Sequence, residues 1–304
     1  MEEVEWIWLN GKFVKWADAK VHVLSHALHY GGGVFEGIRC YDTEKGPAVF
    51  RLNDHMKRLY YSAEVFGLKI PFKRQELYDL TLELIAKNGL TECYIRPIAY
   101  YGYGQMGLNP IGAKVDVSIA AWPWGAYLGE EGIKNGIRMK ISPWIRPPTN
   151  VMPTNAKVNG NYVNSILAKV DAVETGFEEA ILLDIKGNVA ECTGENLFIV
   201  KDNVLITPPT DNTLKGITRD SIMQIALDFE VKVEERLFNK DKLYAADEAF
   251  LTGTAAEVTP IREVDGKKIG EGKPGPITKK LQAKYYESIH GKAPEYEKWL
   301  DFVK

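Results

Sequence analysis

The sequence predicts an α+β protein of two domains, and three observations lead to this prediction. The chain has 304 residues, which is more than one average domain needs. Strand patterns come in runs and do not alternate regularly with helical patterns. A stretch rich in proline, glycine and aromatic residues, WPWGAYLGEEGIKNG, separates two such runs. We expect a smaller domain at 1–121, a linker at 122–134 and a larger domain at 135–304.

The smaller domain is expected to contain strands and two helices. WIWLNGKFV predicts a hairpin that turns at Asn10-Gly11, while VFEGIRCY and AVFRL predict two more strands. Residues 52–66 show helical spacing, with Asn53 as the capping residue. A second helix is expected at 75–87 and ends at Asn88-Gly89. CYIRPIAYYGYG and VDVSIAAWPWG follow as strands.

The larger domain opens with the strand GIRMKISPWI and continues with a helix after a capping segment at 159–161. The helix is predicted by apolar residues at helical spacing, namely Val163, Ile166, Leu167, Val170 and Val173. A meander with turns at 186–188 and 201–203 comes next, and then a helix at about 219–229. EAFLTGTAAEVTPI predicts strand, tight turn and strand, and KKLQAKYYESI a last helix.

Composition and charge exclude several classes of protein. A net charge of −3 and a pI near 6.0 argue against nucleic acid or an anionic membrane as the main partner. The N-terminal sequence has no secretory pattern and no apolar run approaches the ~18 residues of a membrane span, so we expect a cytoplasmic protein. Cys40, Cys93 and Cys192 are too few and too scattered for a disulfide framework or a zinc site.

Two further patterns have competing interpretations. GYGQMG at 102–107 matches a dinucleotide-binding turn, but the next residues lead into another strand and not into a helix, which favours a flexible loop. His22, His26 and His29 have spacings that would suit a metal site on one helical face. No acidic or cysteine residue accompanies them, which favours a packing role, and we expect no metal.

Two residues are candidates for covalent and acid–base chemistry. Lys157 lies in TNAKVNGNY just before a helix, where the partial positive charge of the helix start disfavours the ammonium form and favours a nucleophilic amine. Glu191 lies in AECTGEN within an apolar strand run. A carboxylate there needs a partner such as a protonated heterocycle nitrogen, although an edge-strand glutamate facing water explains the pattern equally well.

Two turns predict anion binding. The amide of Ile217 and the amide and hydroxyl of Thr218, in NTLKGITRD, would form an anion cup, although a simple threonine cap is the alternative. Thr254 and the amide of Ala255, in GTAAE, would form a second one, and Arg58 would add a fixed cation unless it is an ordinary surface arginine. A lysine, a phosphate grip and a buried carboxylate are together what pyridoxal 5′-phosphate requires.

A family resemblance covers about residues 6–303. HALHYGGGVFEGIR, RLNDHMKRL, YIRPI, MGLNP, PWGAYLG, NAKVNGNY, GENLF, GITRD and GTAAEVTPI occur in this order, and together they resemble a branched-chain amino acid aminotransferase of class IV, the fold type IV pyridoxal-phosphate enzymes. The resemblance implies a two-domain, D-amino acid aminotransferase-like α+β fold. Its N-terminal domain would be the smaller α/β one, and its C-terminal domain would have a β-barrel-like core.

The resemblance also implies the role of each site residue. Lys157 would be catalytic, forming a Schiff base with the cofactor and moving a proton at the substrate α-carbon. Cofactor binding would further involve Arg58, Tyr162, Glu191, Ile217, Thr218 and Thr254. Substrate binding would involve Tyr30, Phe35, Gly37, Tyr94, Arg96, Leu108, Trp124, Tyr127, Thr254 and Ala255. Arg96 would bind the γ-carboxylate of glutamate, while Tyr30 and Leu108 would enter the site from a partner subunit.

The implied reaction is a reversible ping-pong transfer of the amino group of leucine, isoleucine or valine to 2-oxoglutarate. A homodimer would be the minimum active unit, and a hexamer built as a trimer of dimers stays open. A D-amino acid aminotransferase or an aminodeoxychorismate lyase would share the lysine, the glutamate and the phosphate cup, but YIRP and PWGAYLG favour the branched-chain L-enzyme. A non-catalytic binding module would leave Lys157, Glu191 and GITRD unexplained together.

Overall fold

The computed structural model describes residues 2–125 and 128–304, which form two compact units. The first unit contains the described residues up to Trp124, together with Ala156–Gly160 and Ser288–Lys304. The second contains the described residues of Gly125–Asn155, together with Asn161–Glu287. Each unit combines a sheet with helices, as the α+β prediction requires. The domain boundaries expected from the sequence stay a prediction.

An antiparallel sheet forms the centre of the first unit, in the strand order β17-β5-β4-β6-β7-β1-β2 with β3 beside β6. The predicted hairpin is confirmed, because β1 pairs with β2 across Asn10 and Gly11, which both have positive φ. The strands are β1 (Trp6–Leu9), β2 (Lys12–Lys15), β3 (Gly33–Phe35), β4 (Ile38–Tyr41), β5 (Ala48–Phe50), β6 (Cys93–Tyr101), β7 (Val115–Trp122) and β17 (Leu300–Phe302).

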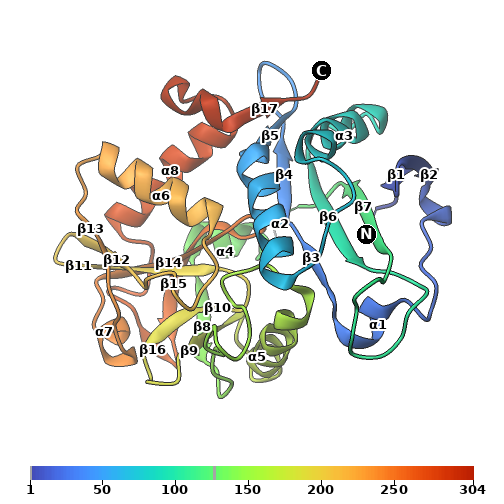
Figure 1. The fold of residues 1–304 in the computed structure, drawn as a ribbon. Helices are drawn as coiled ribbons and strands as arrows, with labels where there is room; N and C mark the ends of the chain where they lie inside the picture. The colour runs from blue at the N-terminus through green and yellow to red at the C-terminus, as the bar shows by residue number, and fades with distance from the viewer. Residues whose placement is uncertain (1, 126–127) are drawn as a thin grey trace. The chain divides into compact units, whose positions relative to one another are not determined.

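Two helices, α2 (Leu52–Phe66) and α3 (Arg74–Lys87), cover this sheet, as Figure 1 shows. Their buried residues share one hydrophobic core with the strands, for example Leu59, Leu77 and Ile95. The short helix α1 (His26–Tyr30) and the 3-10 turns η1 (Trp16–Asp18) and η3 (Pro294–Trp299) complete the unit. The two helices predicted from periodicity are therefore confirmed.

The predicted cap of α2 is wrong. Asn53 lies inside the helix, and the capping position belongs to Arg51, whose backbone is left-handed and whose side chain makes no capping bond. The amide of Leu52 instead donates a 2.9 Å hydrogen bond to Asp301 Oδ2, which lies on β17 near the end of the chain. A carboxylate beside a helix start also interacts favourably with the helix dipole. Asp301, distant in sequence, therefore caps the helix in place of the local residue that was expected.

A mixed sheet forms the centre of the second unit, in the order β10-β9-β8-β15-β14-β11-β12-β13 with β16 beside β15. Neighbouring strands are parallel at β8–β9, β8–β15 and β12–β13 and antiparallel elsewhere. The turns at 186–188 and 201–203 are as predicted, but the continuous meander is not. The strands form two separate hairpins, β9–β10 and β11–β12, because β10 lies at the edge of the sheet and does not pair with β11. The strands are β8 (Ile137–Ile141), β9 (Glu179–Leu183), β10 (Val189–Cys192), β11 (Asn196–Lys201), β12 (Val204–Thr207), β13 (Val233–Glu235), β14 (Glu248–Gly253), β15 (Glu257–Val264) and β16 (Lys267–Lys268).

The sequence predicted two helices near the candidate site, and both are present in the second unit as α5 and α6 (Figure 1). They are α4 (Gly129–Asn135), α5 (Tyr162–Glu174) preceded by the 3-10 turn η2 (Asn159–Asn161), α6 (Ile217–Asp228), α7 (Lys240–Tyr244) and α8 (Pro276–Ile289). Within the part of the chain that the structure describes, we find no helix with the length and hydropathy that a membrane crossing requires.

The buried face of α5 is made of small residues. Ser165, Ala168 and Ala172 are buried, and the two alanines belong to a small core with Ala180 and Leu182 of β9. The apolar residues that predicted this helix form an exposed stripe: Val163, Ile166, Leu167, Val170 and Val173. Alanine and serine let the helix approach the sheet closely, whereas the apolar stripe is left without a partner inside the described chain.

Candidate active site

The expected site residues fall into two groups, one in each unit. The first unit contains Tyr30, Phe35, Gly37, Arg58, Tyr94, Arg96, Leu108, Trp124 and Lys157, and the second contains Tyr162, Glu191, Ile217, Thr218, Thr254 and Ala255. Tyr127 lies outside the described residues.

Lys157 has a backbone that is fixed on both sides. Its amide donates a 2.9 Å hydrogen bond to the hydroxyl of Ser62 on α2, and its carbonyl accepts one of 3.2 Å from the amide of Phe35 on β3. The neighbours Ala156 and Val158 are both buried in the hydrophobic core. Anchoring of this kind sets the direction in which the half-buried lysine side chain leaves the chain.

The ring of Phe35 has two basic side chains near it. Lys157 Nζ lies 4.8 Å from the ring centroid, and Cζ of Arg96 lies 4.9 Å from it. Arg96 Nη2 also donates a 3.1 Å hydrogen bond to the hydroxyl of Tyr94, while its Nε is buried and has no hydrogen-bond partner in the described chain. A half-buried guanidinium with a buried, unused donor is suited to bind a carboxylate.

Tyr94 reaches this cluster because residue 37 is glycine. A Cβ atom at Gly37 would lie 2.0 Å from the Tyr94 hydroxyl oxygen, so any other residue would displace the tyrosine. The Tyr94 ring packs edge-on against Trp124, with centroids 4.5 Å apart, and the carbonyl of Trp124 accepts a 3.1 Å hydrogen bond from Arg39 Nη2. Arg39 was not among the residues that the sequence suggested.

Arg58 is held by a buried carboxylate that the sequence analysis did not single out. Glu36 Oε1 lies 2.7 Å from Arg58 Nε and its Oε2 lies 2.9 Å from Nη2, and His55 Nδ1 lies 2.7 Å from Oε2. Burial acts to raise the pKa of Glu36, but Arg58 and His55 outweigh it and hold that pKa well below its usual range. Arg58 is therefore a fixed cation with a side chain only 11% exposed, and not a mobile surface arginine.

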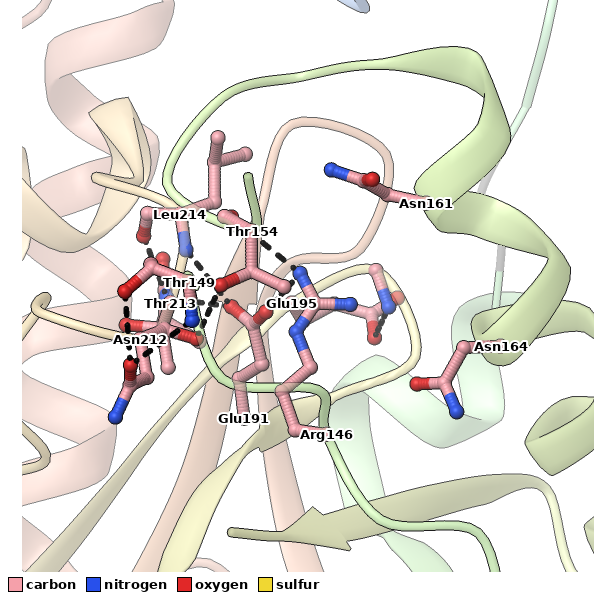
Figure 2. Close-up of polar contacts among 12 residues, drawn as sticks. Arg146, Thr149, Thr154, Asn161, Asn164, Glu191, Glu195, Asn212, Thr213 and Leu214 are labelled. Atoms are coloured by element: carbon pink, nitrogen blue, oxygen red, sulfur yellow. Dashed lines mark hydrogen bonds and ion pairs between the residues drawn. The ribbon is translucent and has the colours of Figure 1, made fainter. Parts of the chain in front are cut away.

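Glu191 lies on the edge strand β10 but does not face water, because it is only 5% exposed. Figure 2 shows it beside Arg146. Arg146 Nη2 lies 2.7 Å from Glu191 Oε1. Glu191 Oε2 accepts hydrogen bonds from Asn196 Nδ2 at 3.3 Å and from the amide of Leu214 at 3.2 Å. The alternative of a solvent-facing glutamate is thus wrong, and the sequence missed Arg146, Asn196 and Leu214 as its partners.

The helix α6 starts where the anion cup was expected. Gly216 is the capping residue, with extended backbone and no side-chain cap, so Thr218 lies inside the first turn and does not act as a simple cap. The first amides of a helix have no acceptor within the helix and carry partial positive charge. The same glycine allows close packing, because a Cβ atom at residue 216 would lie 1.9 Å from Asn196 Oδ1. Asn196 therefore connects the Glu191 carboxylate to the start of α6.

The turn that carries Thr254 and Ala255 joins β14 to β15, as predicted. Close to this turn lies Glu195, because a Cβ atom at Gly253 would approach its Cγ to 3.1 Å. Burial, followed by the charge of Glu179, raises the pKa of Glu195 to about 8. Glu195 is therefore a neutral acid near pH 7, unlike Glu191 with its arginine partner.

Two of the three histidines considered for a metal site, His22 and His26, lie beside the loop 102–107. His26 Nε2 lies 2.8 Å from the carbonyl oxygen of Gly107, and the rings of His22 and Tyr103 have centroids 4.1 Å apart. Among the described residues, no group of three histidine, cysteine or acidic side chains is placed to hold a metal ion. The glycine-rich loop is followed by a turn and β7, so it does not lead into a helix.

Comparison with known proteins gives one consistent result. Residues 33–264 match the model of the amino-transferase class IV family. The branched-chain-amino-acid aminotransferase of Pseudomonas aeruginosa is 49% identical over 298 residues, 98% of this chain and 97% of that protein. The enzyme of the same name from Escherichia coli K12 is 48% identical over 304 residues, 99% of this chain and 98% of that protein.

Solved structures agree with the sequence relatives. The crystal structure of the T.th. branched-chain amino acid aminotransferase with pyridoxamine 5′-phosphate has a TM-score of 0.97 and 51% identity, and the match covers 100% of both chains. The Escherichia coli enzyme has a TM-score of 0.97 and 48% identity, over 99% of this chain and 100% of that one. The chain therefore belongs to the class IV aminotransferases, with their two-domain α+β fold, and within them to the branched-chain-amino-acid aminotransferases.

Proposed function

We propose that this enzyme binds pyridoxal 5′-phosphate and transfers the amino group of leucine, isoleucine or valine to 2-oxoglutarate, reversibly and in a ping-pong sequence. The observation that carries this proposal is the cluster around Phe35, where the Lys157 amine and the Arg96 guanidinium lie on one ring. It combines an amine on a fixed backbone with a buried donor for a substrate carboxylate. An aminotransferase that accepts glutamate needs both.

Each unit, taken by itself, contains groups that suit the cofactor. The amides at the start of α6 and the fixed guanidinium of Arg58 are suited to its phosphate. The three donors around Glu191 suit an ionised carboxylate that would keep the ring nitrogen protonated. When bound, the cofactor supplies a carbonyl group that reacts with amines and a ring that accepts negative charge from the substrate α-carbon.

The protein's own groups would then position and move protons. Lys157, which would attach the cofactor at rest, would take the proton from the substrate α-carbon and deliver it to the C4′ carbon of the cofactor, and the second half-reaction would move a proton in the opposite direction. Tyr162 would donate a hydrogen bond to the phenolic oxygen of the cofactor. Its position one residue after η2, on the first turn of α5, keeps it within five residues of Lys157 along the chain.

The substrate pocket would have apolar walls and one polar end. Phe35, Tyr94 and Trp124 supply aromatic surface for the branched side chains, and Arg96 would bind the γ-carboxylate of glutamate. Thr254 and Ala255 would bind the α-carboxylate. Two further solved structures of the T.th. enzyme support this dual pocket, since one contains 4-methylvaleric acid and the other N-(5′-phosphopyridoxyl)-L-glutamate.

We also propose a homodimer as the minimum active unit, with Tyr30 and Leu108 acting in the partner's site. Both side chains are exposed, Tyr30 by 45% and Leu108 by 84%. Exposed apolar side chains of this size are typical of surfaces that another chain covers. The exposed stripe of α5 offers further apolar surface, which a hexamer built as a trimer of dimers would use.

The visible absorption spectrum of the purified protein tests the proposed function. We expect a band from the lysine-bound cofactor that L-leucine converts in the absence of any acceptor and that 2-oxoglutarate restores. D-leucine is the control, because a D-amino acid aminotransferase would respond to it. The Lys157→Ala variant should lose transamination, and wild-type turnover by this variant or a band indifferent to L-leucine would contradict the proposal.

A further inference from the structure

All contacts of the Glu191 carboxylate described above come from donors. Arg146 provides a charged guanidinium, Asn196 an amide N–H and Leu214 a backbone N–H. An ionised carboxylate only accepts hydrogen bonds, whereas a protonated one would have to donate from one oxygen. The surroundings of Glu191 therefore select its ionised form (Figure 2).

The charge of Arg146 is directed to this one carboxylate. Its side chain is 8% exposed, and Glu191 is its one ion-pair partner in the described part of the chain. Arg146 Nε is buried without a hydrogen-bond partner there, and its further contact, from Nη2 to the Thr154 carbonyl, is long at 3.5 Å. The backbone is fixed as well, because the Arg146 amide donates a 2.8 Å hydrogen bond to the Leu183 carbonyl.

Glu195 shows how the same region affects the protonation of a buried carboxylate that has no ion-pair partner. It lies four residues after Glu191, is 6% exposed, and accepts a 3.1 Å hydrogen bond from the Gly194 amide without an ion pair in the described chain. Burial and the charge of Glu179 raise the pKa of this group to about 8. A buried carboxylate here therefore takes up a proton unless a cation prevents it.

We propose that Arg146 is a positioning residue that keeps Glu191 ionised and aimed for the protonated ring nitrogen of the cofactor. This inference rests on the proposed function only for its last part, the ring nitrogen. The charge state of Glu191 is a property of the apoprotein. Asn196 and Leu214 fix the other oxygen of the carboxylate, so the arginine supplies the charge and these two residues supply the direction.

The apoprotein gives the first test, through thermal unfolding between about pH 5 and pH 8. In Arg146→Met the folded state would hold a proton on Glu191 that the unfolded state releases, so the deficit in Tm relative to wild type should widen as the pH rises. In the double variant with Glu191→Gln this widening should disappear, because no carboxylate is left to titrate. Arg146→Lys, which keeps a positive charge, should restore most of the wild-type profile.

Cofactor binding gives the second test, by titration of each apoprotein with pyridoxal 5′-phosphate. Arg146→Met should weaken binding by about 10- to 100-fold, as partners of ligating groups commonly do. The double variant should bind no more weakly than Glu191→Gln alone, because the arginine acts through the glutamate. Arg138→Met, which breaks the exposed pair with Glu178, is the matched control and should leave both measurements unchanged.

The outcomes separate the inference from the proposed function. A pH-independent Tm deficit in Arg146→Met, or wild-type cofactor affinity in this variant while Glu191→Gln binds weakly, would overturn the role of Arg146 alone. Wild-type affinity in Glu191→Gln would instead overturn the proposed role of Glu191. If Arg146→Met does not fold, Arg146→Lys decides, because a purely steric role of the guanidinium predicts no rescue by lysine.

Discussion

Glu36 illustrates how one buried carboxylate prepares a cation for a ligand. It forms two hydrogen bonds with Arg58, of 2.7 and 2.9 Å, and is itself fully buried. A paired guanidinium loses little conformational freedom when it binds phosphate, because the pair has already fixed it. If Arg58 binds the cofactor phosphate as proposed, the strength of that binding should therefore depend on Glu36, a residue that does not contact the phosphate.

We predict that Glu36→Gln weakens binding of pyridoxal 5′-phosphate by about tenfold, since a neutral amide holds Arg58 with weaker hydrogen bonds. Breaking the buried pair should also lower the free energy of unfolding of the apoprotein by about 3 kcal/mol. Cofactor titration and denaturant unfolding measure the two effects. Glu5→Gln, at an exposed pair with Lys15, is the control, and unchanged cofactor affinity in Glu36→Gln would show that Arg58 needs no support.

Glu195 gives a prediction for the pH dependence of stability. Its pKa is raised from 4.5 to about 8 in the folded protein, so between these values the folded state binds a proton that the unfolded state has released. Stability from this group is therefore complete below about pH 4.5 and is lost as the pH rises toward 8, by on the order of 4 kcal/mol. Glu195→Gln removes the titration, so its stability relative to wild type should increase with pH across this window. A difference that does not change with pH, measured by denaturant unfolding, would contradict the raised pKa.

At the scale of elements, the start of α6 depends on the absence of one methyl group. A Cβ atom at Gly216 would lie 1.9 Å from Asn196 Oδ1, and Asn196 also donates to Glu191 and to the Leu214 carbonyl. We predict that Gly216→Ala displaces Asn196 or the first turn of α6 and weakens cofactor binding by about tenfold, with far-UV circular dichroism unchanged. Gly194→Ala is the control, because a Cβ atom there meets nothing within 4 Å. Equal affinity in the two variants would show that the contact relaxes at no cost to the site.

The sequence predicted those elements whose signals are local. Periodicity located α2, α3 and α6, and Asn10-Gly11 located the hairpin, because helix and turn preferences act within a few residues. The sequence did not predict pairs of residues that are far apart along the chain and come into contact only in the folded protein. The cap of α2 comes from Asp301, which is 249 residues away from Leu52. The partner of Arg58 is Glu36, which lies between β3 and β4 and not on the helix that carries Arg58. A hydrophobic pattern can indicate that a polar group is buried, but it does not identify the distant residue that forms a hydrogen bond or ion pair with it.

The face of α5 shows a second limit of the same reasoning. Its apolar stripe predicted the helix correctly, yet the residues that pack inside the unit are Ser165, Ala168 and Ala172. A hydrophobic stripe shows which side of a helix is to be shielded from water. A second chain can cover that side as well as the core of the same unit can, so the stripe alone does not identify the covering partner. The candidate site was more predictable than its support. Apart from Glu191, the site residues lie in the quoted family motifs, whereas Arg146 lies in none of them, and Arg39, the last residue of HALHYGGGVFEGIR, has no role that the resemblance implies.

At the scale of the whole molecule, the first unit presents exposed apolar residues close to the candidate site residues in sequence. Leu108 and Ile111 are 84% and 80% exposed, and Leu28, two residues before Tyr30, is 67% exposed. Monomers seldom leave so many large apolar side chains in water. A second copy of the chain that covers them would bring Leu108 to the partner's site.

Subunit complementation tests this arrangement. Lys157→Ala and Leu108→Asp should each be nearly inactive alone. The first variant lacks the amine that attaches the cofactor, and the second places a charged side chain in an apolar wall of the substrate pocket. In a mixed dimer one site combines the native Lys157 of one chain with the native Leu108 of the other. Random reassembly of equal amounts should therefore recover about a quarter of the wild-type activity, since half of the dimers are mixed and each has one complete site. If mixed dimers form, as size and mass show, and no activity returns, Leu108 acts within its own chain and the proposed sharing of the site is wrong.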